Sequence, residues 1–128
     1  MNVYFIASER CGTVKIGKSS NIRRRLESVR TDCPDNGVYL LGFIHCRNYE
    51  NGSWLEHHLH RVFNKYHSHR EWFFLTPLVR TAIQKTIFTI TDEQIEDRIR
   101  KDAEDFHNRR IQNILSKQIV MSENKEDI

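Results

Sequence analysis

Hydrophobic residues near the start of the chain form short runs typical of strands. Residues 3–6 (Val-Tyr-Phe-Ile) and 14–16 (Val-Lys-Ile) are rich in β-branched and aromatic types and predict two strands. Gly12 lies between them, and a glycine adopts the positive φ that a tight turn needs, so the pair predicts a hairpin. Residues 38–45 are apolar enough for a longer, central strand, which follows an expected turn at 33–37.

Helical periodicity alternates with these strands. Apolar residues recur at three- and four-residue spacing in segments at about 19–31, 53–66, 76–85 and 91–117. Asn51-Gly52-Ser53 is expected to open the second helix. Thr76 followed by Pro77 predicts the start of the third, and Thr91 with Gln94 predicts a capping box at the start of the fourth.

This order of elements predicts an α+β fold, an α/β sandwich. Its sheet is expected to be small, three-stranded and mainly antiparallel, with helices flanking it. The chain is expected to divide into a domain at 1–75, a C-terminal helical extension at 76–118 packed on that domain, and a disordered tail at 119–128.

Composition excludes several classes of protein. A chain of 128 residues suits one domain with a short appendage. No apolar run approaches the roughly 18 residues of a spanning helix, and the first residues lack the features of a signal peptide. These patterns predict a cytoplasmic protein without membrane association. The three cysteines are scattered, which favours reduced thiols over a disulfide framework.

The charge is unevenly distributed. Residues 1–70 contain eleven Lys/Arg against six Asp/Glu, a balance of +5, whereas residues 71–128 contain nine against eleven, a balance of −2. An anionic partner is therefore expected to bind the first half of the chain.

Arginines of the first predicted helix are candidates for phosphate binding. Arg23 and Arg24 are interpreted first as a solvated basic face that contributes to nucleic-acid binding. Arg25 lies at the edge of the apolar stripe and is expected to point back toward the sheet. A guanidinium held there is suited to binding a phosphate in a fixed orientation.

The second predicted helix carries a candidate metal ligand. Glu56 lies beside the apolar stripe, with His60 four residues later on the same face. A carboxylate there is either an ion-pair partner or a ligand of Mg²⁺, which needs few protein carboxylates when substrate phosphates complete its shell. The nearby histidines lack the spacing of a helical zinc pair.

A tyrosine and two lysines complete the candidate set. Tyr4 is expected to have Lys15 as a neighbour across the hairpin, with Lys18 close by. Ammonium groups at that distance would lower the pKa of the phenol and make Tyr4 a plausible general base. Together these residues would suit a phosphodiester substrate.

These motifs resemble the GIY-YIG nuclease superfamily. Val3-Tyr4 stands at the "IY" position and Lys15-Ile16-Gly17 at the "YIG" position. Residues 56–63, with Glu56, Leu59, His60 and Phe63, and then Glu71-Trp72-Phe73 look like the phage and meiotically up-regulated-gene subgroup. The resemblance covers residues 2–75.

The resemblance implies an endonuclease that cuts DNA, duplex or branched, with one Mg²⁺ or Mn²⁺. It implies that Glu56 holds the metal, Tyr4 activates or orients water, and Arg25 stabilises the phosphate. Lys18 and His60 would assist as further catalytic residues.

Two alternatives stay open. Lys15 replaces the second tyrosine of the motif, which favours a DNA-binding module with weak or no catalysis. The helix at 91–117 favours a protein-interaction domain or a homodimer that forms through this helix.

Overall fold

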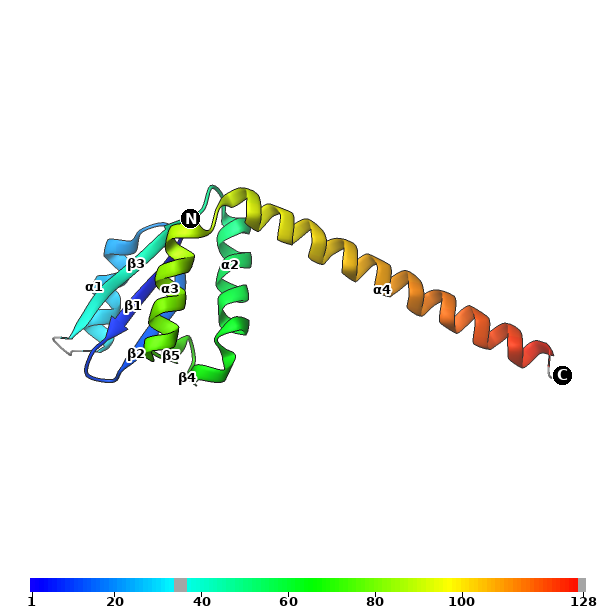
Figure 1. Cartoon of the computed structure of the whole chain (residues 1–128), viewed down its shortest axis with the longest axis horizontal. Helices are drawn as coiled ribbons and strands as arrows, with labels where there is room; N and C mark the ends of the chain where they lie inside the picture. The colour runs from blue at the N-terminus through cyan, green and yellow to red at the C-terminus, as the bar shows by residue number, and fades with distance from the viewer. Residues whose placement is uncertain (34–36, 127–128) are drawn as a thin grey trace. The chain divides into compact units, whose positions relative to one another are not determined.

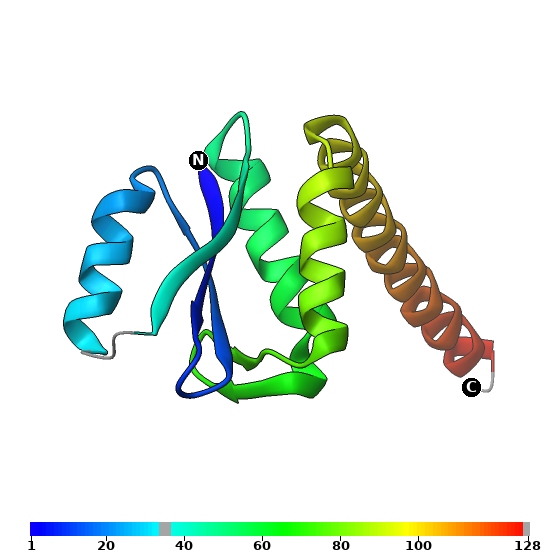
Figure 2. The ribbon, with the colours of Figure 1, turned by 60° about the vertical axis from the view of Figure 1, so that its left-hand side comes forward.

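The computed structural model describes residues 1–33 and 37–126, with side chains up to residue 119. Five strands form one antiparallel sheet in the order β3-β1-β2-β5-β4 (Figures 1 and 2). The strands are β1 (Asn2–Ser8), β2 (Thr13–Ser19), β3 (Val38–His45), β4 (His67–His69) and β5 (Trp72–Phe74). The predicted α+β class is confirmed, and so is the hairpin of β1 and β2, with Gly12 at a φ of 62° in its turn.

The prediction of three strands was wrong, because β4 and β5 were missed. Each has three residues, too few for an alternating pattern to stand out. β4 is the polar run His-Ser-His, and it depends on pairing with β5 rather than on its own composition. The expected turn at 33–37 falls mostly on residues 34–36, which lie outside the described part of the chain.

Helices cover both faces of this sheet. Figure 2 shows α1 (Ile22–Asp32) on one side, with α2 (Tyr49–Val62) and α3 (Pro77–Thr89) on the other. Side chains alternate along a strand, so Tyr4 and Ile6 pack with Val29 of α1. Val3 and Phe5 are buried on the opposite face.

Local caps set the helix ends. The Asn48 side chain accepts a hydrogen bond from the amide of Asn51, so α2 begins at Tyr49 and not at Ser53 as predicted. Gly52 lies inside this helix and leaves room for the Met1 side chain, which a Cβ at this position would meet at 2.7 Å.

The caps of α3 and α4 (Asp92–Glu126) are those predicted. Thr76 accepts a hydrogen bond from the amide of Val79 at the start of α3. In the capping box of α4, the Thr91 and Gln94 side chains each accept from the other's amide, at 3.2 and 3.1 Å.

The chain forms two compact units, Met1–Ile95 and Glu96–Ile128. The first contains α3 and so runs past residue 75, where the sequence suggested a boundary. In the second, α4 is helical to Glu126, including most of the segment expected to be a disordered tail; residues 127–128 lie outside the description. Packing of residues 96–118 on the first unit stays a prediction.

Candidate functional site

Tyr4 is buried on the face of the sheet that packs against α1. It lies in the middle of β1, is 1% exposed, and stands opposite Gly17 of β2. A Cβ added to Gly17 would lie 2.3 Å from the Tyr4 hydroxyl oxygen, so the hydroxyl occupies the space that any other residue would need. The glycine of the "YIG" position is thus required by the tyrosine of the "IY" position.

Burial, rather than neighbouring lysines, controls the ionisation of Tyr4. Desolvation raises the pKa of Tyr4 to about 12; the negative charges of Glu71 and Glu56 add to this effect, and Arg25 opposes it. The expected lowering of this pKa was wrong. Lys15 stands opposite Ile6 and not opposite Tyr4, and the lysines do not offset the cost of burying a phenolate.

The arginines of α1 separate into two groups. Arg24 and Arg25 line a polar hollow of about 350 Å³ at the start of the helix, next to Ser19, Ser20 and Asn21. Arg25 is exposed, yet it acts on Tyr4. The Arg23 side chain is 92% exposed and pairs with Glu27 at 3.8 Å, as the solvated-face interpretation predicted.

Glu56 is a buried carboxylate with a cation beside it. It is 8% exposed on α2, and its Oε2 lies 3.6 Å from the Nζ of Lys18. Lys18 pairs with Val3 across the hairpin and therefore lies on the face away from Tyr4, where its Nζ donates to Ser53 Oγ at 3.0 Å. The expected proximity of Lys18 to the Tyr4 ring is replaced by a set of contacts with α2.

These α2 contacts also hold Lys18 in its charged form. Burial alone would lower the pKa of Lys18, but the hydrogen bond to Tyr49 and the charge of Glu56 outweigh it and raise that pKa. The Nζ lies 4.8 Å from the centre of the Tyr49 ring. Tyr49 and Ser53 were missed by sequence analysis because the helix was expected to begin after Tyr49.

His60 joins α2 to β2. Its Nε2 lies 2.8 Å from the carbonyl oxygen of Ile16, to which it donates, and 3.8 Å from Oε1 of Glu56. The ring therefore fixes the position of α2 against the β2 edge beside the carboxylate.

Lys15 lies on the same face as Tyr4, at the side covered by β5. Its Nζ is 4.0 Å from a carboxylate oxygen of Glu71. Phe73 is buried and Trp72 packs against the cluster around Tyr4.

Several of these residues lie on β2 or on the elements next to it. β5 pairs with residues 13–15, so the remainder of β2 lies beyond that ladder. The charges of Arg25, Glu71 and Glu56 all act on the Tyr4 hydroxyl there, although they come from α1, the β4–β5 turn and α2.

The site offers a metal ion one buried carboxylate. Among the side chains of residues 1–33 and 37–119, no group of three His, Cys, Asp or Glu is arranged to hold a metal. Mg²⁺ is commonly bound through one or two carboxylates, with water and substrate phosphate as its other ligands. Glu56 fits that mode of binding and does not fit a preformed metal cage.

These residues belong to a small α+β domain that places the tyrosine on β1, the arginine on α1 and the carboxylate on α2. The T5orf172 domain model matches residues 1–101, and the chain belongs to this family. The family is related to nucleases of the GIY-YIG and HNH-like kinds. Comparisons with curated proteins and with solved structures find no match. In the part of the chain that the structure describes, no helix is both long and apolar enough to cross a membrane.

Proposed function

We propose that this chain is a divalent-metal-dependent endonuclease that hydrolyses phosphodiester bonds in DNA. The site is of the GIY-YIG type, in the phage and meiotically up-regulated-gene subgroup. The observation that carries the proposal is the buried Tyr4 hydroxyl beside Gly17, whose ionisation is influenced by the charges of Arg25 and Glu56. The membership of a nuclease-related family supports it.

Tyr4 acts in its neutral form. With a pKa of about 12, roughly one molecule in 10⁵ carries a phenolate at pH 7. The hydroxyl therefore orients the attacking water by a hydrogen bond and does not take its proton.

Cations stabilise the charge that develops on the phosphate. Arg25 is exposed at the hollow and is free to present a bidentate fork to two phosphate oxygens. Arg24 and Lys15 add positive charge along the path of the DNA strand. Lys18 and His60 act as positioning residues, because both contact the carboxylate of Glu56.

Mg²⁺ or Mn²⁺, when bound, supplies Lewis-acid stabilisation and a more acidic water molecule. Glu56 would hold it. Because Lys18 lies 3.6 Å from the same carboxylate, we infer that the ion binds together with the substrate phosphate, whose charge attracts both cations.

A DNA-binding module without strong catalysis is the second candidate. The same Lys18–Glu56 pair favours this candidate, because a carboxylate whose charge is already neutralised by an ammonium group binds a metal ion less strongly. Such a module would bind DNA in a salt-dependent way without metal-dependent cleavage.

A nicking assay separates the two. Supercoiled plasmid is incubated with Mg²⁺ or Mn²⁺, with EDTA as the metal-free control, using the full chain and its Glu56→Gln and Glu50→Gln variants. We expect nicking that needs metal, falls at least about 100-fold in Glu56→Gln, and persists in Glu50→Gln, an exposed glutamate of the same helix. Absence of nicking with DNA binding intact would establish the module instead.

We also propose that the chain forms a homodimer through α4. Residues 92–105 contain seven acidic and three basic side chains, whereas residues 106–119 contain three Lys/Arg and no acid. Two antiparallel copies would place each acidic half against a basic half. Large apolar side chains of this segment are exposed and available to the partner: Phe106, Ile111, Ile114, Leu115 and Ile119.

A further inference from the structure

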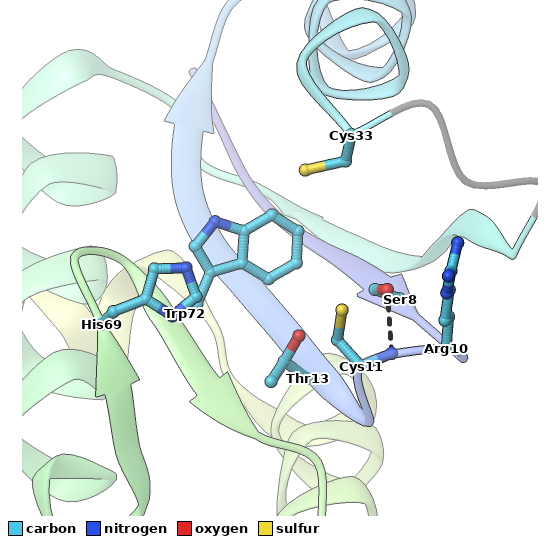
Figure 3. Close-up of a pocket in the computed structure, with 7 residues that line it drawn as sticks. All are labelled: Ser8, Arg10, Cys11, Thr13, Cys33, His69 and Trp72. Atoms are coloured by element: carbon cyan, nitrogen blue, oxygen red, sulfur yellow. Dashed lines mark hydrogen bonds between the residues drawn. The ribbon is translucent and has the colours of Figure 1, made fainter.

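Two cavities adjoin the candidate site on the face that α1 covers. One, of about 280 Å³, lies at the end of the β1–β2 hairpin and is mostly apolar (Figure 3). The other, of about 640 Å³, reaches Lys15 and Glu71. Cys33, His69 and Trp72 line both cavities, which therefore adjoin at these side chains.

An aromatic pair forms the boundary between the cavities. The His69 and Trp72 rings are stacked, with an interplanar angle of 11° and a centroid distance of 6.3 Å. Figure 3 shows the indole extending into the smaller cavity toward Cys33. His69 is exposed and Trp72 is half-buried. Flat ring faces at an accessible cavity are suited to a flat heterocyclic ligand, because aromatic stacking accepts any base.

The smaller cavity has room for one such ligand. Its volume of about 280 Å³ is many times what a single water molecule needs and leaves room for a flat ring system such as a nucleobase. The hydroxyl groups of Ser8 and Thr13 are among its few polar walls. A paired base could not enter, since its partner and stacked neighbours would have to follow it.

Basic side chains surround the cavities where a phosphate backbone would run. Arg10 lines the smaller cavity, and Lys15 and Arg70 line the larger one. Asp32 and Glu71 also line the larger cavity, so its charge is mixed. Arg70 has a φ of 48°, a conformation that costs free energy in a residue with a side chain, and it holds the turn beside His69.

The cavities lie along the strand that carries the site. Lys15 and Thr13 are two and four residues from Gly17 on β2, which corresponds to about 7 and 13 Å at 3.3 Å per residue. A DNA strand whose phosphate lies at Tyr4 therefore places a neighbouring nucleotide at Trp72. The hollow at Arg24 and Arg25 lies at the N-terminal end of α1, whereas Cys33 follows its C-terminal end.

We propose that the cavity beside Trp72 binds one unpaired nucleobase of the strand to be cut, and that the substrate is DNA with such a base: a branch, a flap or a gap. The inference rests on the proposed nuclease function for its choice of ligand. It adds a specificity site formed by the β4–β5 hairpin, and it selects branched or single-stranded DNA over a fully paired duplex.

The test measures binding without cleavage. The full chain, in EDTA and at one salt concentration, is titrated into fluorescent duplexes that contain 2-aminopurine, either paired or in a one-nucleotide bulge. We expect tighter binding of the bulged duplex and quenching of its fluorescence by stacking. Trp72→Leu should weaken binding of the bulged duplex by roughly 5- to 100-fold and leave the paired duplex unaffected.

Control variants keep this test decisive. Trp54→Leu removes the other tryptophan, which stacks on His58 of α2, and should change neither affinity. His69→Ala changes an exposed side chain and should act in the same direction as Trp72→Leu; it decides the question where loss of Trp72 disturbs the fold. Equal binding of both duplexes, or a bulge preference that survives in the His69 and Trp72 variants, would overturn the proposal.

Failure of the nuclease proposal gives a different pattern. A protein that cuts no DNA with metal, yet loses its bulge preference in Trp72→Leu, has the base site without the activity. A protein that cuts paired and bulged DNA equally, with no effect of Trp72, has the activity without the base site.

Discussion

At the scale of single residues, the environment of Tyr4 determines what the site can do. A tyrosine in a strand is ordinarily a packing residue, and this one is packed: it is 1% exposed and lies against Gly17. The charges of Arg25, Glu71 and Glu56 nevertheless influence the pKa of its hydroxyl. Burial keeps it neutral, and that favours hydrogen bonding over proton abstraction.

The raised pKa of Tyr4 predicts a loss of stability at alkaline pH. The neutral form is favoured in the folded protein, so the stabilisation is complete below the unfolded pKa near 10 and is lost as the pH rises toward 12. The loss amounts to about 2–3 kcal/mol. Urea unfolding at several pH values should show it as a difference between the wild type and Tyr4→Phe. Parallel curves for the two proteins would contradict it.

The contact of Gly17 with Tyr4 predicts an asymmetry between two glycines of the sheet. In Gly17→Ala the new Cβ meets the Tyr4 ring and hydroxyl, which the core holds in place, so we expect a loss of about 1–3 kcal/mol in unfolding free energy. In Gly42→Ala the new Cβ meets the end of the Ile87 side chain, which can rotate. The melting temperature of Gly17→Ala should therefore lie well below that of Gly42→Ala. Equal melting temperatures of the two variants would argue against the rigid contact.

At the scale of elements, α2 supplies the residues that hold Lys18 beside Glu56. Its first turns provide Tyr49 and Ser53 for Lys18, and the next turn provides Glu56. These contacts depend on where the helix begins, and the Asn48 cap sets that position. An element end thus controls the geometry of a site several residues away.

The cap of α2 can be tested directly. Asn48→Ala removes the acceptor for the Asn51 amide and should cost about 1 kcal/mol, whereas Asn48→Asp keeps an acceptor and should cost much less. Chemical denaturation measures the difference. If both variants unfold at the same denaturant concentration as the wild type, the cap does not stabilise this helix.

At the scale of the whole molecule, the two compact units differ in how they are stabilised. Met1–Ile95 buries a sheet between helices. In Glu96–Ile128, every side chain from Lys101 to Ile119 is exposed, although several are large and apolar. An isolated helix gains little from its own hydrogen bonds, so a partner is expected to cover these residues.

The proposed antiparallel dimer predicts a dependence on charge and on apolar contact. Phe106→Asp, near the middle of the paired segments, should shift the chain from dimer to monomer. Arg109→Glu with Arg110→Glu should weaken the dimer by placing like charges together. Light scattering during gel filtration over a range of protein concentrations measures both. A wild-type chain that remains monomeric at the highest concentration would exclude the dimer.

The sequence by itself determined the features that depend on near neighbours. The Thr91–Gln94 capping box, the start of α3 at Pro77 and the β1–β2 hairpin all arise from residues a few positions apart, and each was predicted. The motif residues Tyr4, Arg25 and Glu56 were also visible, because their types and spacing are distinctive.

Only the tertiary structure decided the features that depend on distant residues. β4 and β5 are strands because of pairing, which three-residue runs do not reveal. The pKa of Tyr4 rises because the whole fold excludes water from it, and Lys18 lies on Glu56 because α2 packs against β2. Desolvation and ion pairing act through space, so the chain's order alone could not give their direction.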